Sequence, residues 1–364
     1  MTKKRNKIIS LLYFCPRELS GGNRTYALNL LLNLDKIKNL RITAYLNISL
    51  EKELHKKLTN SYVNYIDLPN NVFSIIKERS IFQKIETSFI DIIHAPCTLI
   101  PFYQHNKPMI ATIHDLNFLT LDTRKFKYLY KRFLYKYTIS KCPRLIAISQ
   151  FTKNELINFS KNSPTINVVW NGADSKTIKK KNNPRPYLIS FGHRAHKNIE
   201  QSIKILSKLN QNSYIFDLII VGSTPDLKQK IIPLAKKLHI EQSLTFLEHI
   251  DNDQLEDLYF NATALLFLSK YEGFGLPVIE AMNMRCPVIT SNNASLPEIV
   301  GQYGLIIDEH QDDIAVEYII SLYSNYELFT EITKKAKIYS SSLSWSLCAH
   351  KTSKIYEEVL NDIF

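Results

Sequence analysis

The sequence lacks the features that mark several classes of protein. Its five cysteines are scattered, with neither a CxxC pair nor a metal-ligand spacing, so they predict reduced thiols in a cytoplasmic protein. No stretch approaches the ~20 apolar residues that a membrane-spanning helix needs. The basic N-terminus precedes a short apolar run, 8–15, but Pro16 follows where a signal peptide would place small residues. We therefore expect that run to form a first buried strand.

Internal repeats and low-complexity segments are also absent, and 45% hydrophobic and 22% charged residues describe a globular protein. A chain of 364 residues is too long for one core and fits two domains. The net charge of +12 is unevenly placed, because residues 1–170 carry +15 and the remainder −3. This asymmetry predicts that the first half faces an anionic partner, either nucleic acid or an anionic membrane.

Short apolar runs alternate with helix-like stretches along the whole chain. The predicted strands are 8–13, 42–46, 89–94, 109–113, 144–148 and 166–169 in the first half, and 187–191, 216–221, 244–247, 264–268, 287–290 and 304–307 in the second. Such a series indicates parallel strands with helices on both faces, and two series predict two doubly wound α/β domains. The polar run 174–186 is typical of a linker. We assign residues 1–170 to the first domain and 171–345 to the second, followed by an amphipathic helix, 346–364.

The most informative segment is EGFGLPVIE, which begins at Glu272 and ends at Glu280. Pro277 suits the first turn of a helix, because its missing N–H would be unpaired there in any case. Glu280 would then fall in that first turn. Gly273 and Gly275 let backbone N–H groups approach a ligand closely, and a helix N-terminus attracts a phosphate. The segment predicts a phosphate seat beside two carboxylates that hold sugar hydroxyls; the alternative is a strand–turn–helix connection with incidental acids.

The longer run 265–297, LLFLSKYEGFGLPVIEAMNMRCPVITSNNASLP, resembles the donor-binding region of the retaining glycosyltransferases of the GT-4 family. Their signature of two glutamates separated by seven residues is matched by Glu272 and Glu280. The resemblance implies the GT-B fold, in which two Rossmann-like domains face each other across a cleft and a C-terminal helix crosses back onto the first domain. It also implies an acceptor-binding first domain and a second domain that binds a nucleotide-diphosphate sugar.

The same resemblance implies roles for individual residues of this segment. Glu280 would bind the ribose hydroxyls of the donor, and Glu272 would act at the catalytic centre by holding the transferred sugar. The backbone of the turn would hold the same sugar through Gly273, Phe274, Gly275 and Leu276. The two glutamates are not a glycosidase acid/base pair, because their partners would be hydroxyls.

A basic loop, GHRAHKN at 192–198, follows the first strand of the second half. Similar enzymes place an arginine and a lysine in this loop, where they clamp the donor diphosphate and stabilise the charge on the leaving group. Lys197 matches the lysine. Arg194 is the best match for the arginine, in a loop that is shorter than the family's. A solvated basic loop without a ligand is the alternative.

Two motifs of the first half match the acceptor side of such enzymes. Gly21 and Gly22 follow the first strand, where a glycine loop presents N–H groups to an acceptor or phosphate, although ordinary strand–helix turns also use paired glycines. His114 ends a predicted strand, where open α/β sheets bind ligands, and it resembles the cleft histidine that contacts the donor sugar. We predict a catalytic role for His114 as a donor to a sugar hydroxyl or phosphate. The alternative is a structural histidine beside a helix-capping Asp115.

One acidic motif of the second half could instead bind a metal. The triplet DND at 251–253 matches the DxD that binds a divalent metal in a different glycosyltransferase fold. Because QLEDLY follows, the triplet also fits a helix start with acids in its first turn. We predict no metal and no other cofactor, since cationic side chains and helix dipoles do that work in GT-B enzymes.

The run from Arg124 to Tyr137 is strongly basic and aromatic. Phe126, Leu129 and Phe133 recur with Tyr137 at helical spacing, while cations fill much of the rest. One interpretation is a surface helix that buries this stripe, and the other is a helix that lies on an anionic membrane. Nucleic acid is not favoured, because no recognition module accompanies the run.

Together these features predict a retaining hexosyltransferase in the cytoplasm, in peripheral contact with the inner face of the plasma membrane. The forms YEGFGLP and SNNASLPE look most like the bacterial mannosyltransferase branch, so GDP-mannose is the favoured donor, with UDP-hexoses and dTDP-rhamnose as alternatives. The acceptor would be a glycan or lipid-linked glycan of a surface polysaccharide such as O-antigen or capsule. Two rivals are a UDP-N-acetylhexosamine 2-epimerase of GT-B fold, which the GFGLP core argues against, and a non-catalytic partner subunit.

Overall fold

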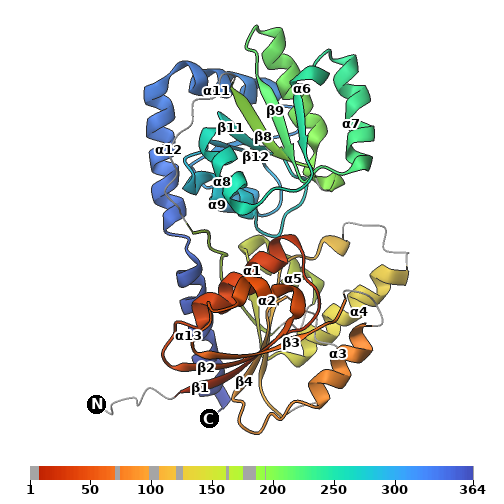
Figure 1. Cartoon of the computed structure of the whole chain (residues 1–364), viewed down its shortest axis with the longest axis vertical. Coiled ribbons are helices and arrows are strands. Elements are labelled where there is room, and N and C mark those ends of the chain that lie inside the picture. The colour runs from red at the N-terminus through yellow and green to blue at the C-terminus, as the bar shows by residue number, and fades with distance from the viewer. Residues whose placement is uncertain are drawn as a thin grey trace. The chain divides into compact units, whose positions relative to one another are not determined.

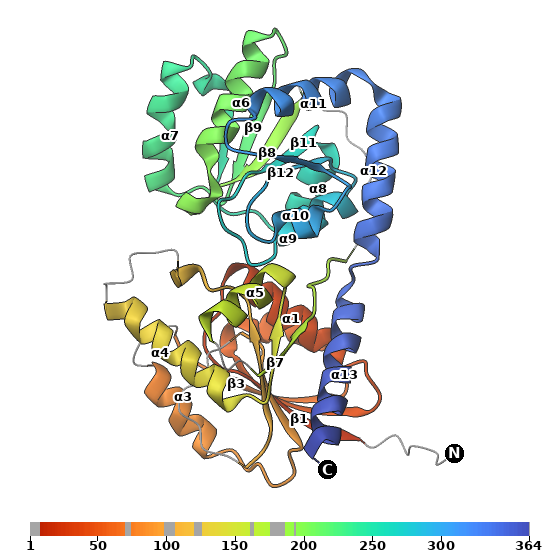
Figure 2. The same cartoon turned by 180° about the vertical axis from the view of Figure 1, so that it is seen from behind.

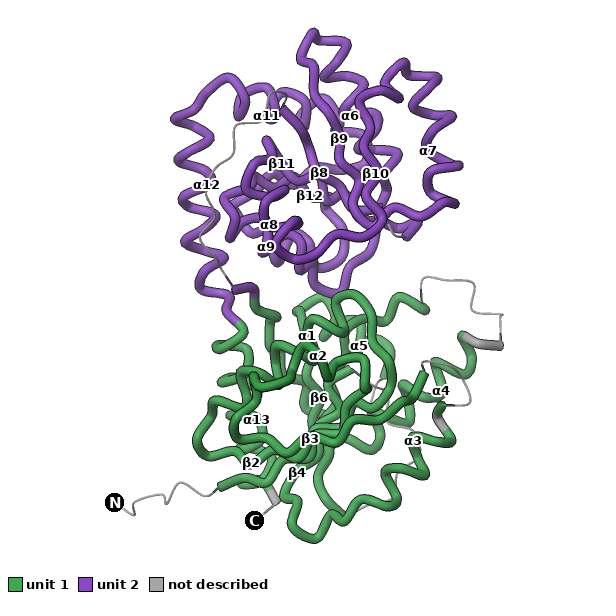
Figure 3. Tube along the Cα trace, viewed as in Figure 1, with its two compact units in different colours: residues 1–172, 345–364 green, residues 173–344 purple. Residues whose placement is uncertain are grey.

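The chain divides into two compact units (Figure 3). Unit 1 comprises Met1–Gly172 and Trp345–Phe364, and unit 2 comprises Ala173–Ser344. The computed structural model describes residues 8–69, 74–97, 106–119, 126–160, 164–174, 186–192 and 194–363. Most of the predicted linker therefore lies outside the described residues. No helix in the described part of the chain has the length and apolar character needed to cross a membrane.

Unit 1 is built around a seven-stranded parallel sheet in the order β3-β2-β1-β4-β5-β6-β7 (Figure 1). Its strands are β1 (Ile9–Cys15), β2 (Leu40–Asn47), β3 (Ser61–Ile66), β4 (Ile92–Ala95), β5 (Met109–Ile113), β6 (Arg144–Ala147) and β7 (Thr165–Val168). Its helices are α1 (Gly21–Leu34), α2 (Glu51–Leu54), α3 (Ser74–Gln83), α4 (Phe126–Lys141), α5 (Gln150–Phe159) and α13 (Trp345–Ile363), with short 3-10 turns at Ile48–Leu50 and Asn117–Leu119. The central strands are apolar because helices bury both of their faces.

Unit 2 repeats the arrangement with a six-stranded parallel sheet in the order β10-β9-β8-β11-β12-β13. Its strands are β8 (Tyr187–Phe191), β9 (Asp217–Val221), β10 (Leu244–Leu247), β11 (Ala264–Phe267), β12 (Val288–Ser291) and β13 (Leu305–Ile307). Its helices are α6 (Ile199–Gln211), α7 (Pro225–Lys237), α8 (Asn252–Asn261), α9 (Leu276–Asn283), α10 (Leu296–Val300), α11 (Asp312–Ser324) and α12 (Tyr326–Ser341), with 3-10 turns η3 (Ala195–Lys197) and η4 (Glu241–Ser243). The strand order reverses between β8 and β11, and open α/β sheets bind ligands beyond the carboxyl ends of the strands at such a switch point.

Helix α13 belongs to unit 1 although it ends the chain, and both views show it beside α1 (Figures 1 and 2). The Tyr356 hydroxyl of α13 lies 2.6 Å from Nδ1 of His94 on β4. Close to Tyr356, in the same C-terminal half of the helix, Arg144 of β6 pairs with Glu358 and, at 2.8 Å, with Asp362. These contacts anchor the last helix to strands that lie more than two hundred residues earlier in the chain.

The predicted fold class, two doubly wound parallel α/β domains, is confirmed, but the predicted strands omit β3. Strand β3 forms one edge of the sheet, and its side chains are only partly buried, with Tyr62 69% exposed. An edge strand of this kind carries no continuous apolar run, and that run was the signal on which the other strands were predicted.

Helix α4 corrects the interpretation that the stripe through Leu129 and Phe133 is buried. Both side chains are 53% exposed, and the core is contacted instead by Leu134, Thr138 and Ile139. The buried face is therefore rotated by about one residue from the predicted stripe, or roughly 100° around the helix. Of the rest of the basic run, residues 124 and 125 lie outside the described residues.

The DND triplet forms a helix cap, as the alternative to a metal motif predicts. Asp251 is the N-cap of α8, and its carboxylate accepts the backbone N–H of Gln254 at 2.7 Å. The Gln254 side chain accepts the Asp251 N–H in return, which completes a capping box. In the described part of the chain, no group of three or more potential metal-ligating side chains converges.

Candidate active site

In unit 2, the predicted lysine and the first predicted glutamate lie in direct contact. Lys197 ends the short turn η3 after β8, and Glu272 lies in the loop between β11 and α9. The Lys197 ammonium donates to the Glu272 carboxylate across 2.6 Å. Nε2 of His196 lies 3.8 Å from the same carboxylate oxygen. Two loops that leave neighbouring strands of the sheet thus bring a cation and an anion together at the switch point.

The surroundings of Lys197 suit a charge that acts on a ligand. The side chain is 6% exposed, and its ammonium lies 4.5 Å from the centre of the Phe267 ring. Burial lowers the pKa of Lys197, whereas the Glu272 carboxylate acts in the opposite direction. Arg194 precedes the turn, has an exposed side chain, and lowers the pKa of Lys197 further through its own charge. Arg194 and Lys197 therefore form one cationic corner, and their role at a diphosphate stays a prediction.

The glycine turn before α9 is fixed by its backbone and by a serine that lies outside the predicted site. Gly275 is the N-cap of α9 with φ of +105°, and a Cβ there would meet Leu296 at 2.9 Å, so the position requires glycine. The Ser295 hydroxyl is within hydrogen-bond distance of two carbonyls of the turn, those of Glu272 at 3.0 Å and Phe274 at 2.8 Å. Phe274 is buried, so only its backbone faces outward. Ser295 lies within the run 265–297 that carries the resemblance, but no role was predicted for it.

Glu280 does not lie in the first turn of α9. The helix begins at Leu276, one residue before Pro277, so Glu280 is its fifth residue and no acid stands in the first turn. The Tyr259 hydroxyl, on α8, donates to the Glu280 carboxylate across 3.4 Å. Burial raises the pKa of Glu280 to about 7; the Tyr259 hydrogen bond lowers it, and the charge of Glu256 raises it. Among the described residues, the Glu280 carboxylate has a hydroxyl partner and no cation paired with it.

Aromatic rings connect these two parts of the unit 2 site. Lys197 lies over Phe267, whose ring centre is 6.0 Å from that of Phe191. Phe191 in turn lies 6.3 Å from Tyr259, which contacts Glu280. One group of packed aromatic rings therefore connects the cationic corner to the half-buried Glu280 carboxylate. Neither Phe267 nor Tyr259 carries a sequence signal that separates it from an ordinary core residue.

In unit 1, His114 lies just past the end of β5 with its protonation fixed by a neighbour. Nε2 of His114 lies 2.9 Å from the carbonyl oxygen of Pro96, so this nitrogen carries the proton and donates it. Burial lowers the pKa of His114, so the ring is neutral at neutral pH. Nδ1 is then an acceptor. The predicted donor role of the ring toward a hydroxyl or phosphate therefore becomes an acceptor role, because the one proton is already used.

His114 packs against the start of α1, where the paired glycines lie. Its ring meets the Tyr26 ring edge-on at 4.7 Å. The Cys97 thiol donates to the carbonyl of Asn23 at 3.1 Å and lies 3.5 Å from His114 Nε2. Gly21 opens α1 with φ of +54°, and a Cβ there would meet no described atom within 4 Å. The first turn of α1, which includes Gly22, is thus open and lies close to His114.

His94 and Asp115 have structural roles. His94 is fully buried, and besides Tyr356 it contacts Thr112 at 2.9 Å. Burial lowers the pKa of His94 to about 3, so it stays neutral. Asp115 accepts the N–H of Asn117 at 3.0 Å and so stabilises the turn after β5. The acid of the HD pair therefore has a structural role in a turn, whereas the role of His114 at a ligand stays a prediction.

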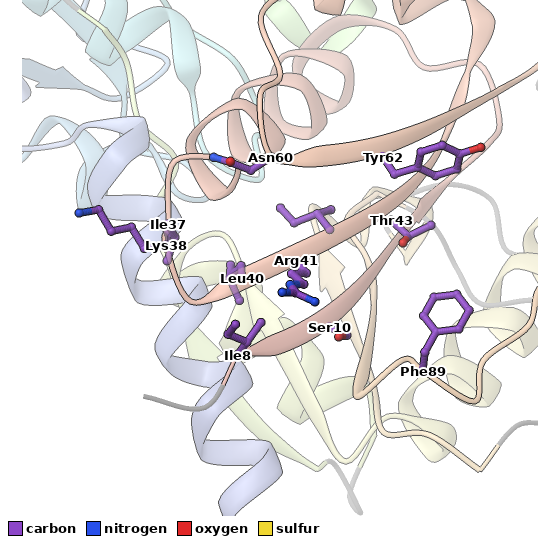
Figure 4. Close-up of a pocket in the computed structure, with 11 residues that line it drawn as sticks. Ile8, Ser10, Ile37, Lys38, Leu40, Arg41, Thr43, Asn60, Tyr62 and Phe89 are labelled. Atoms are coloured by element: carbon purple, nitrogen blue, oxygen red, sulfur yellow. The ribbon is translucent and has the colours of Figure 1, made fainter. Parts of the chain in front are cut away.

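A groove of about 650 Å³ lies elsewhere on unit 1 (Figure 4). It follows the amino-terminal parts of β1 and β2, around Ser10 and Arg41, with Tyr62 and Phe89 at one side. Parallel sheets bind ligands beyond the carboxyl ends of their strands, where His114 lies. The groove is therefore separate from the candidate active site.

Two family models match the chain and together span most of it. The model described as Glycosyltransferase Family 4 matches residues 21–177, and the model described as Glycosyl transferases group 1 matches residues 173–339. The first match therefore contains His114 and the paired glycines, and the second contains the Lys197–Glu272 pair and Glu280.

Curated relatives include enzymes of surface-glycan assembly. The chain is 29% identical over 237 residues to the O-antigen chain mannosyltransferase RfbU of Salmonella typhimurium, a match that covers 61% of this chain and 66% of that protein. It is 25% identical over 349 residues to an uncharacterized glycosyltransferase of Methanocaldococcus jannaschii, covering 93% and 95%. O-antigen chain mannosyltransferase B of Escherichia coli is 32% identical over 114 residues, 31% and 30% of the two chains.

Solved structures share the fold of the whole chain. Sucrose-phosphate synthase from Thermosynechococcus elongatus superposes with a TM-score of 0.79 and 16% identity, covering 97% of this chain and all of that one. HepE of Anabaena, in complex with UDP-glucose, gives a TM-score of 0.73 and 14% identity over 96% of this chain and 100% of its own. At these identities the likeness establishes the GT-B fold.

Proposed function

We propose a donor, an acceptor class and a stereochemical course for this chain, which belongs to the glycosyltransferases of group 1 and family 4. The donor is GDP-mannose, and the mannosyl residue passes with retention of configuration to a glycan or lipid-linked glycan of a bacterial surface polysaccharide. The observation that carries the proposal is the buried Lys197–Glu272 pair at the glycine turn before α9. Similarity to O-antigen mannosyltransferases supports the choice of sugar.

Lys197 and Arg194 are proposed to act on the leaving diphosphate. As the bond to the sugar breaks, negative charge develops on the diphosphate, and preorganised cations stabilise that charge more strongly than they stabilise the bound donor. Lys197 is the main contributor, because its side chain is buried and water screens it little. The N–H groups at the start of α9 add the partial positive charge of the helix N-terminus.

Glu272 and Glu280 are proposed to bind hydroxyls. When the diphosphate replaces Glu272 as the partner of Lys197, the Glu272 carboxylate becomes available to accept hydroxyls of the transferred sugar. Glu280 accepts the two ribose hydroxyls. In unit 1, Nδ1 of His114 is left to accept a hydroxyl of a substrate. The backbone of the turn from Gly273 to Leu276 holds the sugar. No step requires a metal, because Arg194, Lys197 and the helix N-terminus supply the positive charge.

A second proposal concerns the membrane. Helices α3 and α4 lie side by side in both views (Figures 1 and 2). Their exposed apolar side chains are Ile76 on α3, 71% exposed, and Leu129 and Phe133 on α4. The one acid on the two helices, Glu78, is fully buried against Arg17. A face with exposed cations and apolar side chains and no exposed acid is suited to an anionic lipid surface. We propose that α3 and α4 hold this cytoplasmic enzyme at the inner face of the plasma membrane.

The test is a transfer assay with purified protein and a lipid extract from bacteria that make the polysaccharide. GDP-mannose, UDP-glucose, dTDP-rhamnose and UDP-N-acetylglucosamine are supplied in turn, the last also without the lipid extract. The anomeric configuration of the product is read by NMR. Mannosylation from GDP-mannose with retention supports the proposal. UDP is the nucleotide bound by the structural neighbour HepE, and transfer from UDP-glucose alone would replace the donor. Conversion of UDP-N-acetylglucosamine without an acceptor would favour the epimerase. If none of the nucleotide sugars is turned over, the non-catalytic subunit is favoured.

A further inference from the structure

The hydroxyl of Tyr259 makes a hydrogen bond inside unit 2. The side chain is 1% exposed, and its ring packs against Phe191. Among the described residues, the hydroxyl's hydrogen-bond partner is the carboxylate of Glu280, at 3.4 Å. Burying a phenol O–H without an acceptor costs free energy, so a buried tyrosine hydroxyl is paired with one. The position therefore joins α8 to the carboxylate on α9 through a single hydrogen bond.

The ionised state of the Glu280 carboxylate depends on this hydrogen bond. No cation of the described residues pairs with the Glu280 carboxylate. The charged group that acts on its pKa is Glu256, an acid on the same helix as Tyr259. Burial and Glu256 both favour the protonated form, and Tyr259 opposes them. The nearby thiol of Cys286 interacts with Tyr259 rather than with the carboxylate. The ionised state of Glu280 thus rests on one donor.

We propose that Tyr259 is the positioning residue that keeps Glu280 ionised and aimed at the ligand, so that it sets the pH range in which the donor binds. The inference rests on the proposed role of Glu280 as the acceptor of the two ribose hydroxyls. An ionised carboxylate accepts both hydroxyls at once. A protonated one must use an oxygen as a donor and loses part of this contact. Donor affinity should therefore fall as pH falls through the titration of Glu280.

The test compares GDP-mannose binding to the full chain and to Tyr259→Phe by calorimetry, from about pH 6 to about pH 9. Without the phenol hydroxyl, the pKa of Glu280 rises, so the carboxylate protonates at higher pH. We expect the midpoint of the affinity curve to move to higher pH. The dissociation constant at pH 7 should increase about threefold to tenfold and converge with that of the wild type near pH 9. Turnover at saturating donor should not change.

Two further variants separate this role from a structural one. Tyr187→Phe removes another phenol hydroxyl beside α8, which donates to the carbonyl of Leu258 at 2.8 Å, and should leave the pH curve unchanged. In a Glu280→Gln background, Tyr259→Phe should have no pH-dependent effect, because the titrating group is gone. If Tyr259→Phe does not fold, 3-fluorotyrosine at position 259 is a stronger donor and should move the midpoint to lower pH.

The outcomes are distinct. A Tyr259→Phe curve that superposes on the wild-type curve, or an effect that persists in Glu280→Gln, overturns the inference while the wild-type protein still binds donor. Absence of GDP-mannose binding to the wild-type protein at every pH overturns the proposed donor and, with it, this inference.

Discussion

The Lys197 ammonium and the Glu272 carboxylate form an ion pair across 2.6 Å. Each is proposed to serve a different part of the donor, the lysine the diphosphate and the glutamate the sugar. The ion pair therefore keeps both groups in place before the substrate arrives, and it relieves the cost of holding Lys197 as a buried cation. A donor that brings its own anion and its own hydroxyls replaces this pair without leaving either group unpaired.

Removing one partner at a time should separate stability from catalysis. Glu272→Gln leaves a buried cation unpaired and should lower the free energy of unfolding by about 2 kcal/mol. Lys197→Met keeps an apolar side chain over Phe267 and should cost less than about 1 kcal/mol. Both should reduce transfer by about a hundredfold or more. Urea unfolding and initial rates measure the two effects, and Lys208→Met, in an exposed pair with Asp313, is the control. Full activity in Glu272→Gln would contradict the site.

The pH dependence of the free energy of unfolding should reveal what it costs to ionise Glu280 in the folded protein. Its pKa in the folded protein, about 7, is above the ordinary value of 4.5, so the folded state binds the proton more tightly than the unfolded chain. The stability from this group is fully present below pH 4.5 and is lost as pH rises through about 7. Glu280→Gln should match the wild type near pH 4 and exceed it by about 3 kcal/mol at pH 8. Denaturation at both pH values checks this, with the exposed Glu317→Gln as control. A constant difference would reject the shift.

Metal chelation should leave the enzyme active. We expect transfer in excess EDTA to proceed at the rate seen with added Mg²⁺ or Mn²⁺, because side chains supply the positive charge. Asp251→Ala should lower stability by about 1 kcal/mol through loss of the α8 cap and should leave the donor affinity unchanged. Loss of activity in EDTA that Mn²⁺ restores would show that a metal takes part after all.

Charge on α4 should control binding to lipid. Each lysine near an anionic surface contributes about 1 kcal/mol, so Lys131→Glu with Lys136→Glu should weaken binding to phosphatidylglycerol vesicles about thirtyfold or more. The same change in net charge on α12, Lys334→Glu with Lys337→Glu, should have little effect. Leu129→Ser with Phe133→Ser should also release the protein. Vesicle sedimentation checks all three, and equal loss with both charge pairs would indicate a nonspecific field instead of a docking face.

Much of the fold follows from local sequence, because buried parallel strands must be apolar. The runs around Leu11 and Ile110 show this, and both residues are fully buried. The edge strand β3 was not predicted, because an edge strand is partly exposed to solvent and carries no continuous apolar run. The face of α4 was misassigned for a related reason: Leu129 and Phe133 have the spacing of a buried stripe, but composition does not reveal which stripe meets the core.

The residues of the unit 2 site could be found from motif and spacing, but not their contacts. Nothing in the spacing of Lys197 and Glu272 indicates that they pair, since the contact depends on two loops meeting at the switch point. Tyr259 and Ser295 act through hydrogen bonds to other site residues, and such partners carry no motif of their own. The tautomer of His114 likewise depends on a carbonyl, that of Pro96, which any residue type would supply.

The most direct test of the account is a thermal-shift screen of GDP, UDP, dTDP, ADP and their sugars against the wild-type protein, Lys197→Met and Glu280→Gln. A ligand at about a hundred times its dissociation constant adds ~2.7 kcal/mol to the native state. We predict that GDP and GDP-mannose stabilise the wild-type protein and that either substitution abolishes most of the shift. Equal shifts in all three proteins, or no shift with any nucleotide, would contradict the assignment of these residues to the donor.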